Sequence, residues 1–144
     1  MKALVVFDSN FGNTKLVAEA IGRSLGDQTP VIPVTAMTAE HLRGVTLLVV
    51  GSPINGWRPS EKTGHWLSQL KPNQLRNVSV ATFDTRVSLI IHGDAAKQIS
   101  KHLLDAGATL AAQPTWFFVE GKEGPLRPGE LARAKAWAKT LMSG

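Results

Sequence analysis

The most constraining feature of this sequence is an alternation of two hydrophobic patterns along the chain. Five short apolar runs, rich in β-branched or aromatic residues, alternate with segments in which apolar residues recur at helical spacing. A helix between two strands of one sheet returns the chain to its starting edge, so this order predicts parallel strands linked by right-handed crossovers. We therefore predict an α/β fold with a doubly wound, three-layer, five-stranded parallel sheet in the strand order 2-1-3-4-5.

The expected strands lie at residues 2–8, 31–34, 46–50, 78–83 and 109–119. The expected helices lie at residues 13–25, 60–70, 94–104 and 130–142, with one or two helical turns at 38–43. The helical residues expected to face the core are Trp66, Leu67 and Leu70; Ala95, Ala96, Ile99, Leu103 and Leu104; and Leu131, Ala134, Trp137, Ala138 and Leu141. Trp116, in the last strand, is also expected to be a packing residue.

Size and composition favour one globular domain over residues 1–144. The chain has 144 residues, of which 43% are hydrophobic and 19% charged, and this is the ordinary range for a domain with a single core. It has no cysteine, which excludes disulfides, thiolate metal sites and thiol nucleophiles, and its four histidines share no ligand-like spacing, so no metal site is expected. No apolar run approaches the roughly 20 residues of a membrane helix. The N-terminal run is too short for a signal peptide, so we expect a cytoplasmic protein without a membrane partner.

The chain is basic, with 16 lysines and arginines against 11 acidic residues and a net charge of +5. An excess of cations can indicate a nucleic-acid partner or simply a solvated basic surface. The cations are scattered and form no arginine-rich run. We therefore favour the solvated surface and expect no specific nucleic-acid partner.

Three loops are expected to meet where a ligand would bind. In a sheet of this order the ligand crevice lies outside the carboxyl ends of the strands, at the switch point between strands 1 and 3. The loops at residues 9–14, 52–60 and 84–92 follow strands 1, 3 and 4. The ligand-binding residues are therefore expected in these three loops.

The first loop has the composition of a phosphate site without a cation. It carries hydroxyls, side-chain amides and Gly12 directly before a helix, whose unpaired N–H groups and partial positive charge can hold a phosphate. The alternative is a capping turn in which Ser9 or an asparagine caps the helix and nothing binds. The loop lacks the lysine of a P-loop and the three glycines of a dinucleotide fingerprint, so a phosphate monoester on a smaller ligand fits better.

These segments resemble those of the flavodoxin family, whose phosphate loop has the pattern Thr/Ser-x-Thr/Ser-Gly-x-Thr. Two further segments, which follow strands 3 and 4, look like flavodoxin segments, and the resemblance spans the chain without the insertion of long-chain members. Phe11 departs from the pattern, because it replaces a hydroxyl donor. The segments that carry the resemblance are Ser9-Asn10-Phe11-Gly12-Asn13-Thr14, Gly51-Ser52-Pro53 and Phe83-Asp84-Thr85-Arg86.

The resemblance implies a flavodoxin-like domain that binds flavin mononucleotide (FMN). The phosphate would lie on the first loop and the isoalloxazine ring between the second and third loops, with Trp57 as a flat apolar contact instead of a core residue. We assign no catalytic and no metal-binding residue. The expected cofactor-binding residues are Ser9, Asn10, Phe11, Gly12, Asn13 and Thr14; Pro53, Ile54, Asn55, Gly56 and Trp57; and Phe83, Asp84, Thr85 and Arg86.

The third loop departs from the family, which commonly places a second aromatic residue against the flavin. The chain has no tyrosine, and residues 84–92 contain no phenylalanine or tryptophan. Val87, Leu89 or Ile90 would cover that face, or it is left to solvent or a partner. Asp84 and Arg86 either bond to the polar edge of the flavin or form a salt bridge with each other.

The resemblance further implies an electron-transfer protein whose flavin passes through a semiquinone. The Asn55-Gly56 dipeptide favours a tight turn, and its peptide would flip so that its carbonyl accepts a hydrogen bond from the new N5–H group. Arg58 and Arg86 would flank the ring and make the second reduction potential less negative than in acidic relatives. The net charge implies a redox partner with an acidic docking face. The sequence leaves two alternatives open, a NAD(P)H-dependent flavin or quinone reductase of the same fold and a flavin-free interaction module.

Overall fold

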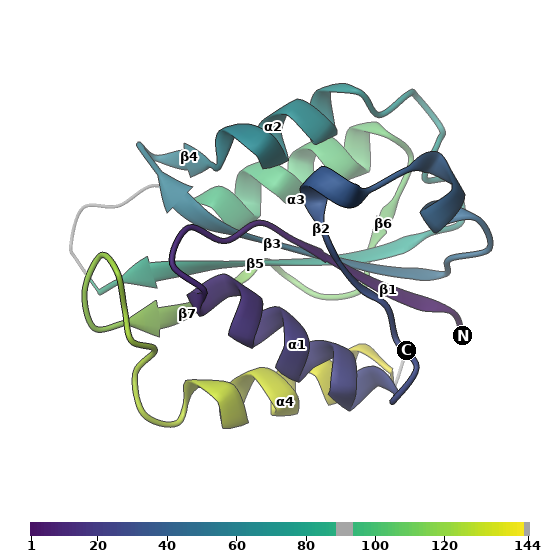
Figure 1. Ribbon diagram of the computed structural model, residues 1–144. Helices are drawn as coiled ribbons and strands as arrows, with labels where there is room; N and C mark the ends of the chain where they lie inside the picture. The colour runs from purple at the N-terminus through teal and green to yellow at the C-terminus, as the bar shows by residue number, and fades with distance from the viewer. Residues whose placement is uncertain (89–93, 143–144) are drawn as a thin grey trace.

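The computed structural model describes residues 1–88 and 94–142, and a mostly parallel sheet runs through it (Figure 1). Its strand order is β2-β1-β3-β5-β6, with β7 also paired to β5 and a short β4 paired antiparallel to β3. The predicted order is confirmed, because β5 takes the place of the fourth strand. The strands are β1 Ala3–Phe7, β2 Val31–Pro33, β3 Leu47–Asn55, β4 Arg58–Pro59, β5 Ser79–Val87, β6 Thr109–Leu110 and β7 Thr115–Val119.

Helices cover both faces of the sheet. In Figure 1 the pair α1 and α4 lies below the sheet, and the pair α2 and α3 lies above it. Short 3-10 turns, η1 Val34–Ala36 and η2 Ala39–Leu42, precede β3. No helix in the described part of the chain is both long and apolar enough to cross a bilayer. The helices are α1 Asn13–Leu25, α2 Glu61–Ser68, α3 Ala95–Asp105 and α4 Glu130–Leu141.

The side chains of β1 alternate between two separate hydrophobic cores, one on each face of the sheet. All five residues of this strand are buried. Val5 and Phe7 belong to the core beneath α1 and α4, whereas Leu4 and Val6 belong to the core beneath α2 and α3. Successive side chains of a strand point to opposite faces, so a strand without polar residues requires cover on both sides.

The last predicted strand is divided in two. β6 pairs with Ser79 and Val80 of β5, and β7 pairs with Phe83 through Val87 further along the same strand. Residues 111–114 lie between the two pieces, and Pro114 has no N–H to donate to a ladder. The continuous strand predicted at residues 109–119 is therefore wrong in its middle.

Three predicted packing residues lie at the surface. Leu104 is 41% exposed, because the buried stripe of α3 runs through Ile99 and Leu103, and the next position turns away from it. Leu131 is 38% exposed and Trp116 is 39% exposed. The other tryptophans predicted to pack, Trp66 and Trp137, are partly buried against the two cores, as expected.

Glu130 occupies the buried position at the start of α4, next to Leu131. Its carboxylate accepts a hydrogen bond from the backbone N–H of Phe118 at 2.6 Å and two from the guanidinium of Arg133. Arg133 also donates to the carbonyl of Trp116, so the two side chains satisfy backbone groups of β7. The hydrogen bond from Arg133 holds the pKa of Glu130 below its ordinary value of 4.5, although partial burial opposes this.

We expect Glu130→Gln to lower the free energy of unfolding at neutral pH by about 1–2 kcal/mol, since a charge-assisted pair becomes a neutral one. A carboxyl whose folded-state pKa is lowered stabilises the fold above its ordinary pKa, and the contribution is lost as the pH falls through the folded-state value. Urea unfolding at pH 7 and in acid measures this. The gap between wild type and variant should shrink in acid, and a gap independent of pH would contradict the assignment.

Candidate functional site

A cavity of about 230 Å³ opens where the carboxyl ends of β1, β3, β5 and β7 meet. It lies at the switch point between β1 and β3, where the strand order predicts a ligand. Loops far apart in the sequence line it together. Its lining residues are Ser9, Asn10, Phe11, Asn13, Thr14, Pro53, Ile54, Asn55, Thr85, Arg86, Val87, Val119 and Lys122.

The first loop leaves the N-terminus of α1 uncapped. The N-cap residue is Gly12, which has φ of 94° and, among the described residues, no side chain bonds to this helix end. Ser9 accepts the N–H of Gly12 at 2.9 Å and so shapes the loop without capping the helix. The predicted capping of the helix by Ser9 or an asparagine is therefore wrong. The first-turn N–H groups have no acceptor within the helix and are available to an anion.

Two side-chain pairs tie the loops of the cavity together. The hydroxyls of Thr14 and Thr85 lie 2.8 Å apart, both buried, and join the start of α1 to β5. The amide nitrogen of Asn10 donates to the amide oxygen of Asn55 at 2.7 Å, which joins the first loop to the second. The predicted loops thus meet, and hydrogen bonds between their side chains hold them together.

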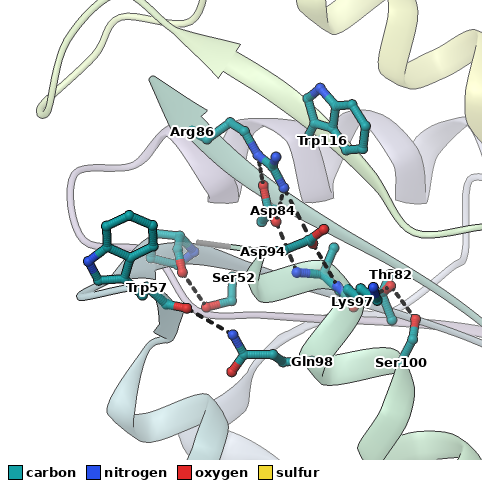
Figure 2. A network of polar contacts seen from close by, with 12 residues as sticks. Ser52, Trp57, Thr82, Asp84, Arg86, Asp94, Lys97, Gln98, Ser100 and Trp116 are labelled. Atoms are coloured by element: carbon teal, nitrogen blue, oxygen red, sulfur yellow. Dashed lines mark hydrogen bonds and ion pairs between the residues drawn. The ribbon is translucent and has the colours of Figure 1, made fainter. Parts of the chain in front are cut away.

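The second loop is a two-residue hairpin, shifted by one position from the prediction. Asn55 pairs with Arg58, so the turn residues are Gly56 and Trp57, with φ of 55° and 73°. The predicted turn on Asn55-Gly56 is therefore wrong by one residue. The side-chain amide of Gln98 on α3 donates to the carbonyl of Trp57 at 2.8 Å and holds the turn (Figure 2).

Trp57 is 56% exposed, so it is not a core residue. Neither Gly56 nor Trp57 lines the cavity, and the hairpin tip stands at the rim beyond Ile54 and Asn55, which do. If the aromatic ring of a ligand extended out of the cavity toward this tip, the exposed indole of Trp57 could pack against it.

The segment predicted as the start of the third loop belongs to a strand. β5 continues to Val87, and successive residues face opposite sides of the sheet. Thr85 faces α1, as its bond to Thr14 shows. Asp84 faces α3, where it accepts the N–H of Ala96 at 2.9 Å.

Asp84 and Arg86 form a buried ion pair, the second of the two predicted alternatives. Two nitrogens of Arg86 bond the two carboxylate oxygens of Asp84, each at 2.7 Å, and Asp94 lies 3.5 Å from the same guanidinium (Figure 2). The guanidinium carbon lies 4.6 Å from the ring centre of Trp116. Burial raises the pKa of Asp84 even though Arg86 opposes the shift. Asp84 does not line the cavity, whereas Arg86 does.

Phe83 lies in the core and does not line the cavity. It is fully buried and packs edge to face on Phe117 and Trp137, at centroid distances of 5.8 and 6.3 Å. Its ring fills the space beside Gly51, where an added Cβ would lie 2.0 Å from the ring. A direct contact between this side chain and a ligand in the cavity has no support in the structure.

Two lining residues were not predicted from the sequence. Val119 and Lys122 come from the end of β7 and the turn that follows it. The signal that would have found them is the parallel order itself, since β7 ends at the same edge of the sheet as β1, β3 and β5. Of the residues proposed to cover the flavin, Val87 lines the cavity, while Leu89 and Ile90 lie outside the described residues.

Comparison with known proteins identifies the architecture. No family model matches the chain, and no curated protein matches it. Among solved structures, flavodoxin 2 from Bacillus cereus is similar with a TM-score of 0.84 and 20% identity over 99% of both chains. A flavodoxin from the domain Archaea is similar with a TM-score of 0.80 and 21% identity, over 99% of this chain and 97% of that one. The protein has the flavodoxin fold.

The flavodoxin fold of this chain also matches part of a larger protein. Rubredoxin oxygen:oxidoreductase from Desulfovibrio gigas is similar with a TM-score of 0.78 and 20% identity, over 99% of this chain and 36% of that chain. The two flavodoxins, by contrast, are matched along nearly their whole length. The fold predicted from the alternating pattern is thus confirmed, with matches over 99% of the chain.

Proposed function

We propose that this protein binds FMN in the cavity at the β1–β3 switch point and exchanges single electrons with a protein partner in the cytoplasm. The observation that carries the proposal is the uncapped N-terminus of α1, which opens onto a cavity lined by all three predicted loops. The similarity to flavodoxins adds to this support.

The lining residues fit the parts of FMN. The first-turn N–H groups of α1, with the side chains of Ser9 and Asn13, suit the phosphate because they are neutral donors at the positive end of a helix. Ile54 and Val87 offer apolar surface to the tricyclic ring. The cavity is smaller than the roughly 300–1,000 Å³ of a typical ligand site, so the ring would extend toward Trp57 at the rim. FMN would supply reversible electron transfer there.

The charges around the cavity change one expectation. Arg86 is neutralised by Asp84, and Arg58 is exposed on β4 and does not line the cavity. These two arginines therefore do not support the less negative second potential expected from them, and Lys122 is the other cation that lines the cavity, with no ion pair within the described part of the chain. The net charge of +5 continues to favour a partner with an acidic docking face.

A reductase of the same fold is the second candidate, because another cavity adjoins the first. It has a volume of about 780 Å³ and shares Ser9, Asn10 and Asn55 with the proposed flavin site. A second substrate there would lie next to the flavin, across the three residues that the two cavities share. Oxidation of NADH or NADPH by the purified flavin-loaded protein alone would favour the reductase, and its absence favours the carrier.

We expect Ser9→Asp to weaken FMN binding at least tenfold, because a carboxylate beside the phosphate repels it. The same carboxylate can still accept the N–H of Gly12 and is favourable at a helix N-terminus, so the empty protein should remain folded. Fluorescence titration with FMN and with riboflavin measures the effect, and Ser9→Asn is the neutral control.

Riboflavin affinity should change little in either variant. Equal weakening of FMN and riboflavin by the aspartate would place the phosphate elsewhere. If wild type binds neither flavin, the flavin-free interaction module is the better account.

A further inference from the structure

We infer that Lys122 contacts the phosphate of the bound flavin and adds a salt-sensitive cationic contact to a site otherwise built from neutral donors. This inference rests on the proposed FMN function. The first loop carries no cation of its own between residues 9 and 14, and a lysine from a distant turn supplies one.

A turn fixes the position of Lys122. The N–H of Gly124 donates to the carbonyl of Gly121 at 3.0 Å, which closes a four-residue turn with Lys122 at its second position. The base of the turn is held where the N–H of Glu120 donates to the carbonyl of Pro125 at 2.8 Å. Lys122 therefore projects from an anchored turn.

The turn is docked on the helix end that would bind the phosphate. The side-chain amide of Asn13 donates to the carbonyl of Glu123 at 3.1 Å. Gly124 has φ of 106°, and a Cβ there would lie 2.6 Å from the amide oxygen of Asn13. The positive φ favours glycine at this position, and the amide of Asn13 occupies the space where a side chain would begin. Lys122 is thus brought to the first turn of α1, where it lines the same cavity as Asn13 and Thr14.

The charge of Lys122 is available to a ligand. Among the described residues it takes part in no ion pair, whereas Arg86, the other cation lining the cavity, is held by Asp84. The carboxylates nearest in the chain, Glu120 and Glu123, are both exposed and do not line the cavity. A phosphate dianion at the helix end would meet Lys122 as an unpaired charge of opposite sign.

The test compares Lys122→Met with wild type in titrations with FMN and riboflavin at low and at high salt. Lys101→Met is the matched control, since it removes the same charge from α3 without touching this cavity. We expect Lys122→Met to weaken FMN binding about fivefold to tenfold at low salt, with the difference shrinking at high salt. Lys122→Arg should retain most of the affinity, and riboflavin binding should be unchanged.

Three results would overturn the inference. If wild type binds FMN and Lys122→Met binds it equally well, the lysine makes no phosphate contact and the FMN site stands without it. If FMN and riboflavin weaken equally, the lysine acts on the shape of the loop. If wild type binds neither flavin, the proposed function fails and this inference fails with it. Thermal unfolding of the empty variants checks that this exposed substitution leaves the fold unchanged.

Discussion

Replacing Arg86 with alanine is expected to lower the free energy of unfolding by about 3–5 kcal/mol. The substitution leaves the carboxylate of Asp84 buried against α3 with the N–H of Ala96 but without its bidentate partner. An unpaired charge in a low-dielectric interior costs far more than the pair contributes. It also removes the cation that packs on Trp116.

The pH dependence separates this cause from a general loss of packing. Burial raises the pKa of Asp84, and removing Arg86 takes away a contribution that lowers it. The folded state then binds a proton more tightly than the unfolded state, so the variant should regain stability as the pH falls through the folded-state pKa of Asp84. Urea unfolding of Arg86→Ala, repeated from neutral pH into acid, measures this gain in stability.

The double variant Arg86→Met with Asp84→Asn supplies the control. It removes both charges and keeps an oxygen for the N–H of Ala96. Its loss of stability should be well below the sum of the losses of Arg86→Met and Asp84→Asn measured singly, since in the double variant neither charge is left alone. Additive losses, or a deficit of Arg86→Ala that persists unchanged in acid, would contradict a buried ion pair at this position.

Phe83→Ala is expected to destabilise the protein by about 3–5 kcal/mol, the range for removing a fully buried aromatic ring. The ring packs against Phe117 and Trp137 and fills the gap beside Gly51. Chemical unfolding measures the loss. Since Phe83 does not line the cavity, FMN affinity of the folded variant should stay within a few-fold of wild type. A large loss of FMN binding by a folded variant would contradict this and indicate that Phe83 contacts the ligand.

Gly51 supplies the complementary half of this test. An added Cβ would collide with the ring of Phe83, so Gly51→Ala alone should be strongly destabilising. In the Phe83→Ala background the same methyl enters the space vacated by the ring and should cost much less. Equal costs in the two backgrounds would show that the ring and the glycine are not in contact.

The fold was predictable because its signal is distributed along the chain. Continuous apolar runs such as the first four residues of β3 can be buried only in a sheet covered on both faces, and apolar helical stripes such as that of α3 provide the cover. The first loop was also predictable, since its glycine and short polar residues stand directly between a buried strand and a helix.

The predictions of site residues were wrong where the side of the sheet to which a side chain points decides whether it can reach the cavity. Residues 84–86 were predicted to begin a loop, but they extend β5, and their side chains alternate between the α1 side and the α3 side of the sheet. The spacing of Asp84 and Arg86, two residues apart, places both on one face and would have predicted their pairing once the strand was extended. Lys122 lies far from the first loop in sequence, and the docking of its turn on Asn13 brings it to the start of α1.

The most direct test of the central claim is the change in backbone amide chemical shifts as FMN is added to the isotope-labelled protein. The account predicts the largest changes at the first-turn amides Asn13, Thr14 and Lys15, whose N–H groups would bind the phosphate, together with changes around Ile54 and Val87. Riboflavin should affect the second group and leave the first nearly unchanged. Saturable FMN binding that leaves the start of α1 unperturbed would contradict the account.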